Sequence, residues 1–249
     1  MKPCSKAHST TWKTAYARKE KLRYNAIMRN LKNALLLKQL YQLKQLGYRY
    51  TNITPCKEES TSFTLPNEFE ALKKQAINCH LCELSKTRQH VVFGEGDIHA
   101  KLMFIGEGPG ASEDSMGRPF VGRSGELLTK MIENVLHLKR EAVYITNIVK
   151  CRPPNNRVPT PSEAHTCQPY LLKQIELIKP KLIVTLGGTA YHYLTGDETG
   201  ITKVRGTLHQ QNGYMLIPTY HPSYLLRNPS AKREVFEDLK KVKALLENP

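Results

Sequence analysis

The chain has 249 residues and a formal net charge of +15, a length that allows one substantial α/β domain and an extension. No apolar run approaches the roughly 20 residues that crossing a bilayer requires, and the first residues lack the apolar segment of a secretory signal. These features argue against membrane-spanning and secreted proteins, and we expect a soluble, cytoplasmic protein without a membrane partner.

The positive charge is concentrated near the N-terminus. Residues 1–57 contain thirteen Lys and Arg and a single acidic residue, Glu20. Between about residues 11 and 46, apolar side chains recur at steps of three and four, which predicts an amphipathic helix. We predict that residues 1–66 form a basic helical extension and a linker. Its charge favours binding to nucleic acid, and the alternatives are a solvated helix face, a structural cap or a docking element for a partner.

The rest of the chain, residues 67–249, is predicted to form the main domain. A first helix is expected up to about Ile77, before strand-like runs at 101–105, 143–145, 181–186 and 214–218. We expect a long loop at 111–123, and helices at 124–137, 162–178 with Ser162 as N-cap, directly after Gly187-Gly188, and at 231–247. Strands that alternate with helices predict an α/β fold with a parallel sheet covered on both faces.

Polar residues follow three of the expected strands. Gly-Glu-Gly-Pro-Gly at 106–110 follows the first strand, and Asn147 and His221 follow two later ones. Because the carboxyl ends of parallel strands share one edge of a sheet, where open α/β sheets bind ligands, we expect Glu107, Asn147 and His221 to meet there. Taken singly, each residue has an ordinary explanation, as a surface acid, a turn residue or a hydrogen-bonded histidine. Their joint occurrence favours a binding site.

Four of the six cysteines form two pairs. Cys79 and Cys82 are separated by two residues, Cys151 begins a proline-rich loop, and Cys167 lies sixteen positions later on an expected helix. Disulfides are rare in intracellular proteins, so two pairs that converge on one site indicate either Zn²⁺ or an iron–sulfur cluster. The spacing does not decide between these and does not exclude a redox dithiol. The other two cysteines are interpreted as ordinary thiols.

Together these motifs resemble those of the family 4 uracil-DNA glycosylases. The glycine-rich turn at 106–110, Arg-Pro-Phe-Val-Gly at 118–122, Thr-Asn at 146–147, His-Pro-Ser at 221–223 and the four cysteines follow the order of that family, from about residue 69 to the C-terminal helix. The resemblance implies a uracil-DNA glycosylase-like fold, with a four-stranded parallel sheet flanked by helices. It also implies a [4Fe-4S] cluster on Cys79, Cys82, Cys151 and Cys167.

The resemblance further implies an enzyme of base excision repair, which flips uracil out of DNA and hydrolyses its N-glycosidic bond to leave an abasic site. Phe120 matches the aromatic residue that stacks on the extruded base. Glu107 matches a residue near position 5 of the base, where it can refuse thymine or orient water. The implied substrate-binding residues are Gly106, Glu107, Gly108, Phe120, Asn147 and His221, of which Glu107, Asn147 and His221 are the catalytic ones.

Two alternatives to such an enzyme bind uracil-DNA without catalytic turnover. A sister group of glycosylases binds uracil-DNA covalently through a histidine in a basic insert, and residues 149–158 contain neither histidine nor insert. The other alternative is an iron–sulfur or zinc module that binds uracil-DNA without cleaving it, which does not explain Glu107, Phe120, Asn147 and His221 together. We therefore expect a glycosylase that acts as a monomer on uracil-containing DNA, double- or single-stranded, in association with the nucleoid. Leu225 and Leu226 are both candidates for a wedge in the duplex.

Overall fold

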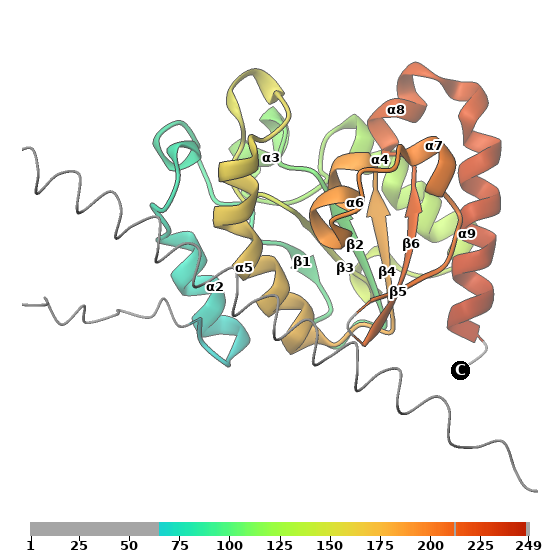
Figure 1. Ribbon diagram of the computed structural model, residues 1–249, viewed down its shortest axis with the longest axis horizontal. Coiled ribbons are helices and arrows are strands. Elements are labelled where there is room, and N and C mark those ends of the chain that lie inside the picture. Colours follow the sequence, from blue (N-terminus) through green and yellow to red (C-terminus); the bar gives the residue numbers. More distant parts are fainter. Residues whose placement is uncertain (1–64, 212, 248–249) are drawn as a thin grey trace, which may run out of the picture. The chain divides into compact units, whose positions relative to one another are not determined.

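The computed structural model describes residues 65–211 and 213–247. The predicted basic extension over residues 1–66 lies outside this part of the chain except for its last two residues, and it stays a prediction. A mixed sheet stands at the centre of the described domain (Figure 1), with the strand order β1-β3-β2-β4-β6-β5. The strands are β1 (Glu95–Gly96), β2 (Leu102–Gly106), β3 (Tyr144–Asn147), β4 (Leu182–Leu186), β5 (His209–Gln211) and β6 (Tyr214–Thr219).

The four predicted strands form the parallel centre of the sheet. β2 pairs in parallel with β3 and with β4, and β4 pairs in parallel with β6. The expectation of a wholly parallel, four-stranded sheet is wrong at the edges, because β1 and β5 add antiparallel strands on the two sides. These edge strands have two and three residues, too few to produce the alternation of apolar and polar residues by which a strand is recognised in a sequence.

Alternate residues of the central strands enter two separate hydrophobic clusters, as the pleat of a strand requires. In β2, Met103 and Ile105 face a cluster that α5 and α6 complete. Leu102 and Phe104 face the other cluster, to which α4, α8 and α9 contribute. Because both faces are covered, the strands read as continuous apolar runs in the sequence.

The helices agree with most of the predicted ones and add several. They are α2 (Phe69–Ile77), α3 (Ala111–Met116), α4 (Arg123–Met131), α5 (Pro161–Ile178), α6 (Gly188–Thr195), α7 (Ile201–Val204), α8 (Pro222–Arg227) and α9 (Lys232–Glu247). α4 continues into a π-helical turn, Ile132–Leu136. Shorter 3₁₀ turns occupy Glu83–Lys86, Arg140–Ala142, Pro154–Asn156 and Pro229–Ala231.

Two predictions about the helices need correction. The expected loop at 111–123 contains α3, which begins after Gly110 and ends at Gly117, whose left-handed φ of 69° suits a C-cap. The N-cap of α5 is Thr160 rather than Ser162, because Thr160 forms a capping box with Glu163. In the part of the chain that the structure describes, no helix combines the length and hydropathy that spanning a membrane requires.

Candidate active site

The carboxyl edge of the sheet brings the three strand-end residues together. Gly106 at the end of β2 lies directly opposite Asn147 at the end of β3, so Glu107 begins the chain beyond the same edge. His221 follows β6 by two residues. Figure 1 shows β4 and β6 pointing toward the edge where α6, α7 and α8 gather. A cavity of about 670 Å³ opens there, and its lining includes Glu107, Phe120, Asn147 and His221.

Gly106, predicted as a substrate-binding residue, is not among the residues that line the cavity, and it leaves no room for a side chain. A Cβ atom at this position would stand 2.4 Å from Asn147 Oδ1 and 2.6 Å from Phe120 Cζ. Both distances are shorter than van der Waals contact. Glycine at the end of β2 is therefore required for the Asn147 amide and the Phe120 ring to occupy their positions.

The Asn147 amide is buried and has an unused acceptor. The residue is 1% exposed, and within residues 65–211 and 213–247 its Oδ1 atom finds no hydrogen-bond donor. A buried polar atom without a partner is costly in a folded protein unless a ligand or water satisfies it. On the backbone side, the Asn147 carbonyl accepts a hydrogen bond of 2.7 Å from Lys150 Nζ, which helps to fix the residue.

His221 is held as a neutral ring with a defined tautomer. It is the N-cap of α8, and its Nδ1 accepts from the Ser223 backbone N–H at 3.1 Å, with Ser223 Oγ 2.7 Å from the same nitrogen. Since Nδ1 accepts, the ring proton lies on Nε2. Burial and the nearby Arg227 lower the pKa of His221 to about 4, against a smaller opposing effect of Glu113. The site thus contains a neutral imidazole whose Nε2–H is available as a donor.

Phe120 lines the cavity from an unusual backbone conformation. Its side chain is 6% exposed, and its ring centroid lies 5.7 Å from that of His221. Its φ of 51° is left-handed, which is rare for a bulky residue. Phe120 lies in the loop between α3 and α4, and its side chain packs in the hydrophobic cluster beside α4 and α8. It is both a core residue and a wall of the cavity.

The glycine-rich turn forms the floor between these groups. The carbonyl of Glu107 accepts from the Val149 backbone N–H at 3.2 Å, and its side chain is partly exposed at the cavity. A Cβ atom on Gly108 would stand 2.8 Å from Val149 Cγ2. An acidic residue in place of Gly108 would therefore displace Val149, which is fully buried.

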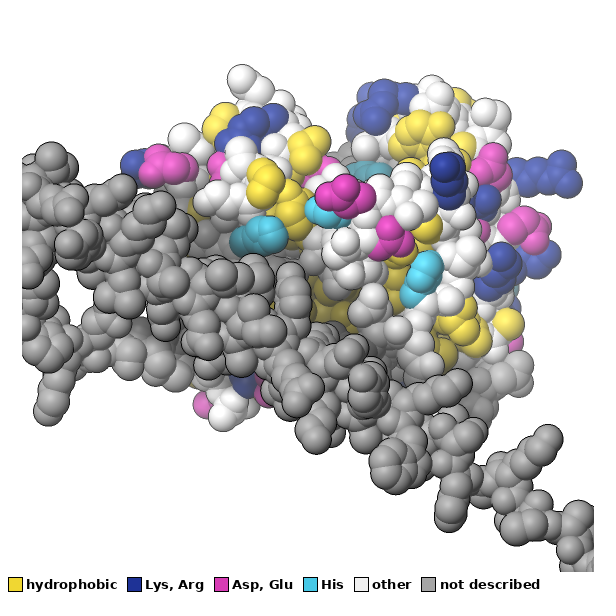
Figure 2. All heavy atoms as spheres, viewed as in Figure 1, with side chains coloured by type: hydrophobic (Ala, Val, Ile, Leu, Met, Phe, Trp, Pro, Cys, Tyr) yellow, Lys and Arg dark blue, Asp and Glu magenta, His cyan; other side chains and the backbone are white. Residues whose placement is uncertain are grey.

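Two arginines contribute to the lining of the cavity. Figure 2 shows Lys and Arg over the loop before α5 and over α8, and Arg157 and Arg227, which belong to these segments, line the cavity. Of the two candidate wedge residues, Leu225 is 1% exposed and belongs to the core, whereas Leu226 is 39% exposed. Only Leu226 is therefore free to contact a duplex.

Sequence reasoning missed several residues that line the cavity, among them Glu113, Arg157, Tyr220 and Arg227. Only Glu113 had a local signal, because a Glu three residues after a potential N-cap is the pattern of a capping box. The expectation of a loop at this point concealed the pattern. The other three residues reach the cavity through tertiary folding alone.

The four paired cysteines all line one small cavity, of about 20 Å³. Within the described ranges, none of the four forms a disulfide. Arg88 Nη1 donates to Cys151 Sγ at 3.2 Å, and the Lys150 backbone N–H donates to Cys167 Sγ at 3.3 Å. Burial raises the pKa of Cys82 and Cys151, and that of Cys167 to about 12.

The donor set fits a group that prefers sulfur ligands, since hydrogen bonds to the sulfur atoms stabilise thiolates. In the described ranges no three His, Cys, Asp or Glu side chains are arranged to hold a single metal ion. A multi-iron cluster does not need such an arrangement, because its thiolates bind separate irons.

Known proteins match this chain over most of its length. The family model described as the uracil DNA glycosylase superfamily matches residues 93–240. A type-4 uracil-DNA glycosylase of Thermotoga maritima is 47% identical over 188 residues, which cover 74% of this chain and 97% of that protein. Type-4 uracil-DNA glycosylases of Sulfurisphaera tokodaii and Saccharolobus solfataricus are each 45% identical, over 74% and 72% of this chain and 87% of each relative.

The region matched by the family model contains every strand of the described sheet and the four residues Glu107, Phe120, Asn147 and His221. The relatives extend the likeness beyond that region at identities of 45% to 47%. This chain belongs to the uracil-DNA glycosylase superfamily and, within it, to the type-4 uracil-DNA glycosylases.

Proposed function

We propose that this protein is a monofunctional DNA-repair glycosylase that extrudes uracil from DNA and hydrolyses its N-glycosidic bond, leaving an abasic site. The observation that carries the proposal is the buried Asn147 Oδ1, which has no hydrogen-bond partner among the described residues and lies at a cavity shared with Glu107, Phe120 and His221. The substrate is uracil-containing DNA, double- or single-stranded, and the enzyme acts as a monomer. The basic extension over residues 1–66 strengthens DNA binding without reading sequence.

Recognition of uracil rests on the polarity of the Asn147 amide. Its Oδ1 can accept from uracil N3–H while its Nδ2 donates to O4. Cytosine presents the reversed pattern of donor and acceptor, so an amide in a fixed orientation rejects it. Stacking on the Phe120 ring adds roughly 1–3 kcal/mol, which offsets part of the few kcal/mol that unstacking and unpairing the base cost.

Bond cleavage places negative charge on the leaving base and positive charge on the sugar. As the bond between N1 and C1′ breaks, its electron pair remains on the uracil, and the Nε2–H of His221 donates to O2 as charge develops there. A water adds to C1′ of the sugar, and the proton that it gives up is balanced by protonation of the uracil anion from solvent. Glu107 is the candidate for orienting this water or for excluding the methyl group of thymine.

The direct test compares uracil-containing with thymine-containing oligonucleotides, each followed by alkaline cleavage of abasic sites. We expect alkali to cleave the uracil-containing oligonucleotide and not the thymine-containing one. We expect no strand scission before the alkali is added. Borohydride should trap no enzyme–DNA adduct, because no lysine in these motifs matches a Schiff-base nucleophile. Tight binding of uracil-DNA without abasic sites would instead support the alternative of a binding protein without turnover.

We further propose a [4Fe-4S] cluster on Cys79, Cys82, Cys151 and Cys167. The all-cysteine donor set and the N–H donors of Arg88 and Lys150 toward the sulfurs support it. These four cysteines would hold the cluster, which would supply a covalent link between distant segments of the chain. The protein's own contribution is to hold the loop before β1 against the start of the loop after β3 and against α5.

Replacement of Cys82 by alanine is expected to remove the visible absorbance of the cluster and to lower the thermal midpoint and solubility, because ligand loss removes a folding constraint. The measurement combines an absorption spectrum, an iron determination and a thermal melt. Cys56→Ala, which changes a cysteine outside the four, is the matched control and should keep colour and stability. A colourless Cys82→Ala protein with unchanged stability and activity would contradict the structural role.

A further inference from the structure

The backbone at Phe120 is strained and must be held from outside. A φ of 51° costs free energy for a residue with a bulky side chain, and such conformations persist where surrounding contacts over-determine them. Gly125 in α4 is one such contact, since a Cβ atom there would stand 1.9 Å from the Phe120 carbonyl oxygen. The other stabilising contacts are hydrogen bonds to the residues on either side of Phe120.

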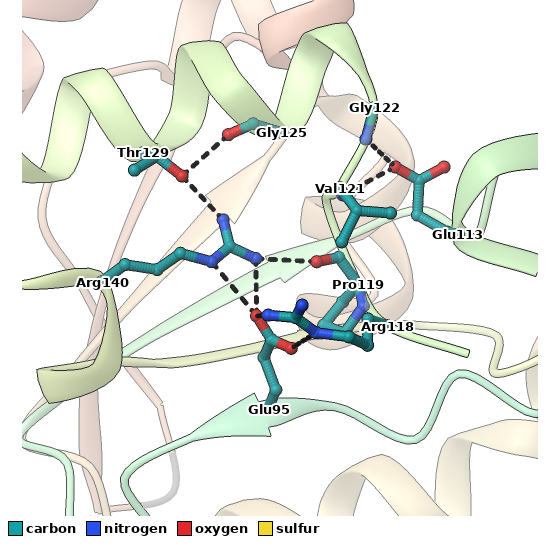
Figure 3. Close-up of polar contacts among 9 residues, drawn as sticks. All are labelled: Glu95, Glu113, Arg118, Pro119, Val121, Gly122, Gly125, Thr129 and Arg140. Carbon is teal, nitrogen blue, oxygen red and sulfur yellow. Dashed lines mark hydrogen bonds and ion pairs between the residues drawn. The ribbon is translucent and has the colours of Figure 1, made fainter. Parts of the chain in front are cut away.

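On the N-terminal side, Arg140 binds the backbone of the residue immediately before Phe120. Arg140 Nη2 donates to the Pro119 carbonyl at 2.8 Å and to Glu95 Oε1 at 2.9 Å, and Arg140 Nη1 donates to Thr129 Oγ1 at 2.9 Å (Figure 3). Glu95 also accepts from Arg118 Nε at 2.7 Å. The loop is thus tied to β1 and α4.

On the C-terminal side, one buried carboxylate holds the next two residues. Glu113 is 8% exposed. Its Oε1 accepts from the backbone N–H groups of Val121 at 3.0 Å and Gly122 at 2.9 Å, as Figure 3 shows. Its other oxygen, Oε2, accepts from the Gly110 backbone N–H at 3.1 Å. Glu113 therefore joins the last residue of the glycine-rich turn to the loop that carries Phe120.

We propose that Glu113 is a positioning residue for the extruded base, an inference that rests on the proposed function. By joining the two loops through one carboxylate, Glu113 fixes the distance between the Phe120 ring, which stacks on uracil, and the turn that carries Glu107. Because both of its oxygens accept from backbone N–H groups, Glu113 acts on the base through Phe120. Residues 118–122 thus adopt their binding conformation before DNA arrives.

The geometry requires a carboxylate rather than an amide. Both oxygens of Glu113 accept, and all three of their partners are backbone N–H donors. A glutamine has one oxygen and one N–H₂ group, so it can accept hydrogen bonds from only one of the two loops. Its N–H₂ group would face the backbone N–H donors of the other loop. The three N–H groups also offset the carboxylate charge, which would otherwise oppose the negative charge that develops on the base.

The test uses Glu113→Gln, with Asp114→Asn as the matched control. Asp114 is the adjacent residue of α3, is 2% exposed, and accepts from the backbone N–H groups of Gln89 and His90 rather than from residues 118–122. We expect Glu113→Gln to lower the single-turnover rate of uracil release by up to about 100-fold and to weaken inhibition by free uracil, with DNA affinity within about threefold. Asp114→Asn should change neither the rate nor the uracil inhibition.

A double-mutant cycle with Phe120→Ala separates positioning from a general structural effect. If Glu113 acts through Phe120, Glu113→Gln should slow the Phe120→Ala enzyme by no more than about twofold, because the two changes then share one interaction. Additive effects, or a Glu113→Gln rate equal to or above that of the wild type, would overturn the proposal. A thermal melt of each variant excludes misfolding as the cause. A wild-type enzyme that released no uracil would instead refute the proposed function itself.

Discussion

Replacement of His221 by alanine is expected to lower the single-turnover rate of uracil release by about 100- to 1,000-fold. The loss should fall on the chemical step, because the hydrogen bond from Nε2 to uracil O2 strengthens only as the base gains negative charge. The affinity for uracil-containing duplex should change little. Rates measured with enzyme in excess over a labelled oligonucleotide, together with equilibrium binding, distinguish the two effects.

His99→Ala is the matched control, since His99 is exposed and does not line the cavity. It should keep the wild-type rate, and an unchanged rate in His221→Ala would remove His221 from the site. A second readout comes from the lowered pKa of His221, about 4 in the folded state, against about 6.5 when unfolded. Between these pKa values only the unfolded state binds the proton. The free energy of unfolding of the wild type should therefore decrease as the pH is lowered from about 6.5 to about 4, and His221→Ala should lack this decrease.

Gly106→Ala is expected to lower the same rate by about 100-fold or more, because a misplacement of about 1 Å at a reacting site has effects of that size. The added methyl group would stand 2.4 Å from Asn147 Oδ1 and 2.6 Å from Phe120 Cζ. Both groups must therefore move, and we expect the discrimination between uracil and cytosine to weaken as well. Single-turnover rates on strands containing each base measure the two consequences.

Gly200→Ala provides the control, because a Cβ atom on Gly200 would meet no described residue other than its chain neighbours within 4 Å, and Gly200 has a φ of −59°. It should leave the rate unchanged. A Gly106→Ala enzyme with a rate within about threefold of the wild type would mean that Asn147 and Phe120 are not held as the structure describes. Overpacking itself costs about 1–3 kcal/mol of stability, so a thermal melt should accompany the rates.

The sequence by itself determined the parallel centre of the sheet and which residues follow its strands. Strand-length apolar runs separated by helical periodicity indicate parallel strands, whose carboxyl ends share an edge, so Glu107, Asn147 and His221 could be assigned to one site. The pair Cys79 and Cys82 was recognisable in the same way, because a gap of two residues is a local property of the chain. What these signals share is that each depends on residues close together in the sequence.

Only the tertiary structure decided how that site is shaped. The edge strands β1 and β5 are too short for a periodic pattern, and they form because a neighbouring strand offers hydrogen bonds. The burial of Leu225, the missing space at Gly106 and the left-handed turn at Phe120 depend on packing between segments far apart in the chain. The role of the Glu113 carboxylate also depends on such packing. A side chain that joins two loops leaves no pattern in the sequence, because the loops come within hydrogen-bond distance only on folding.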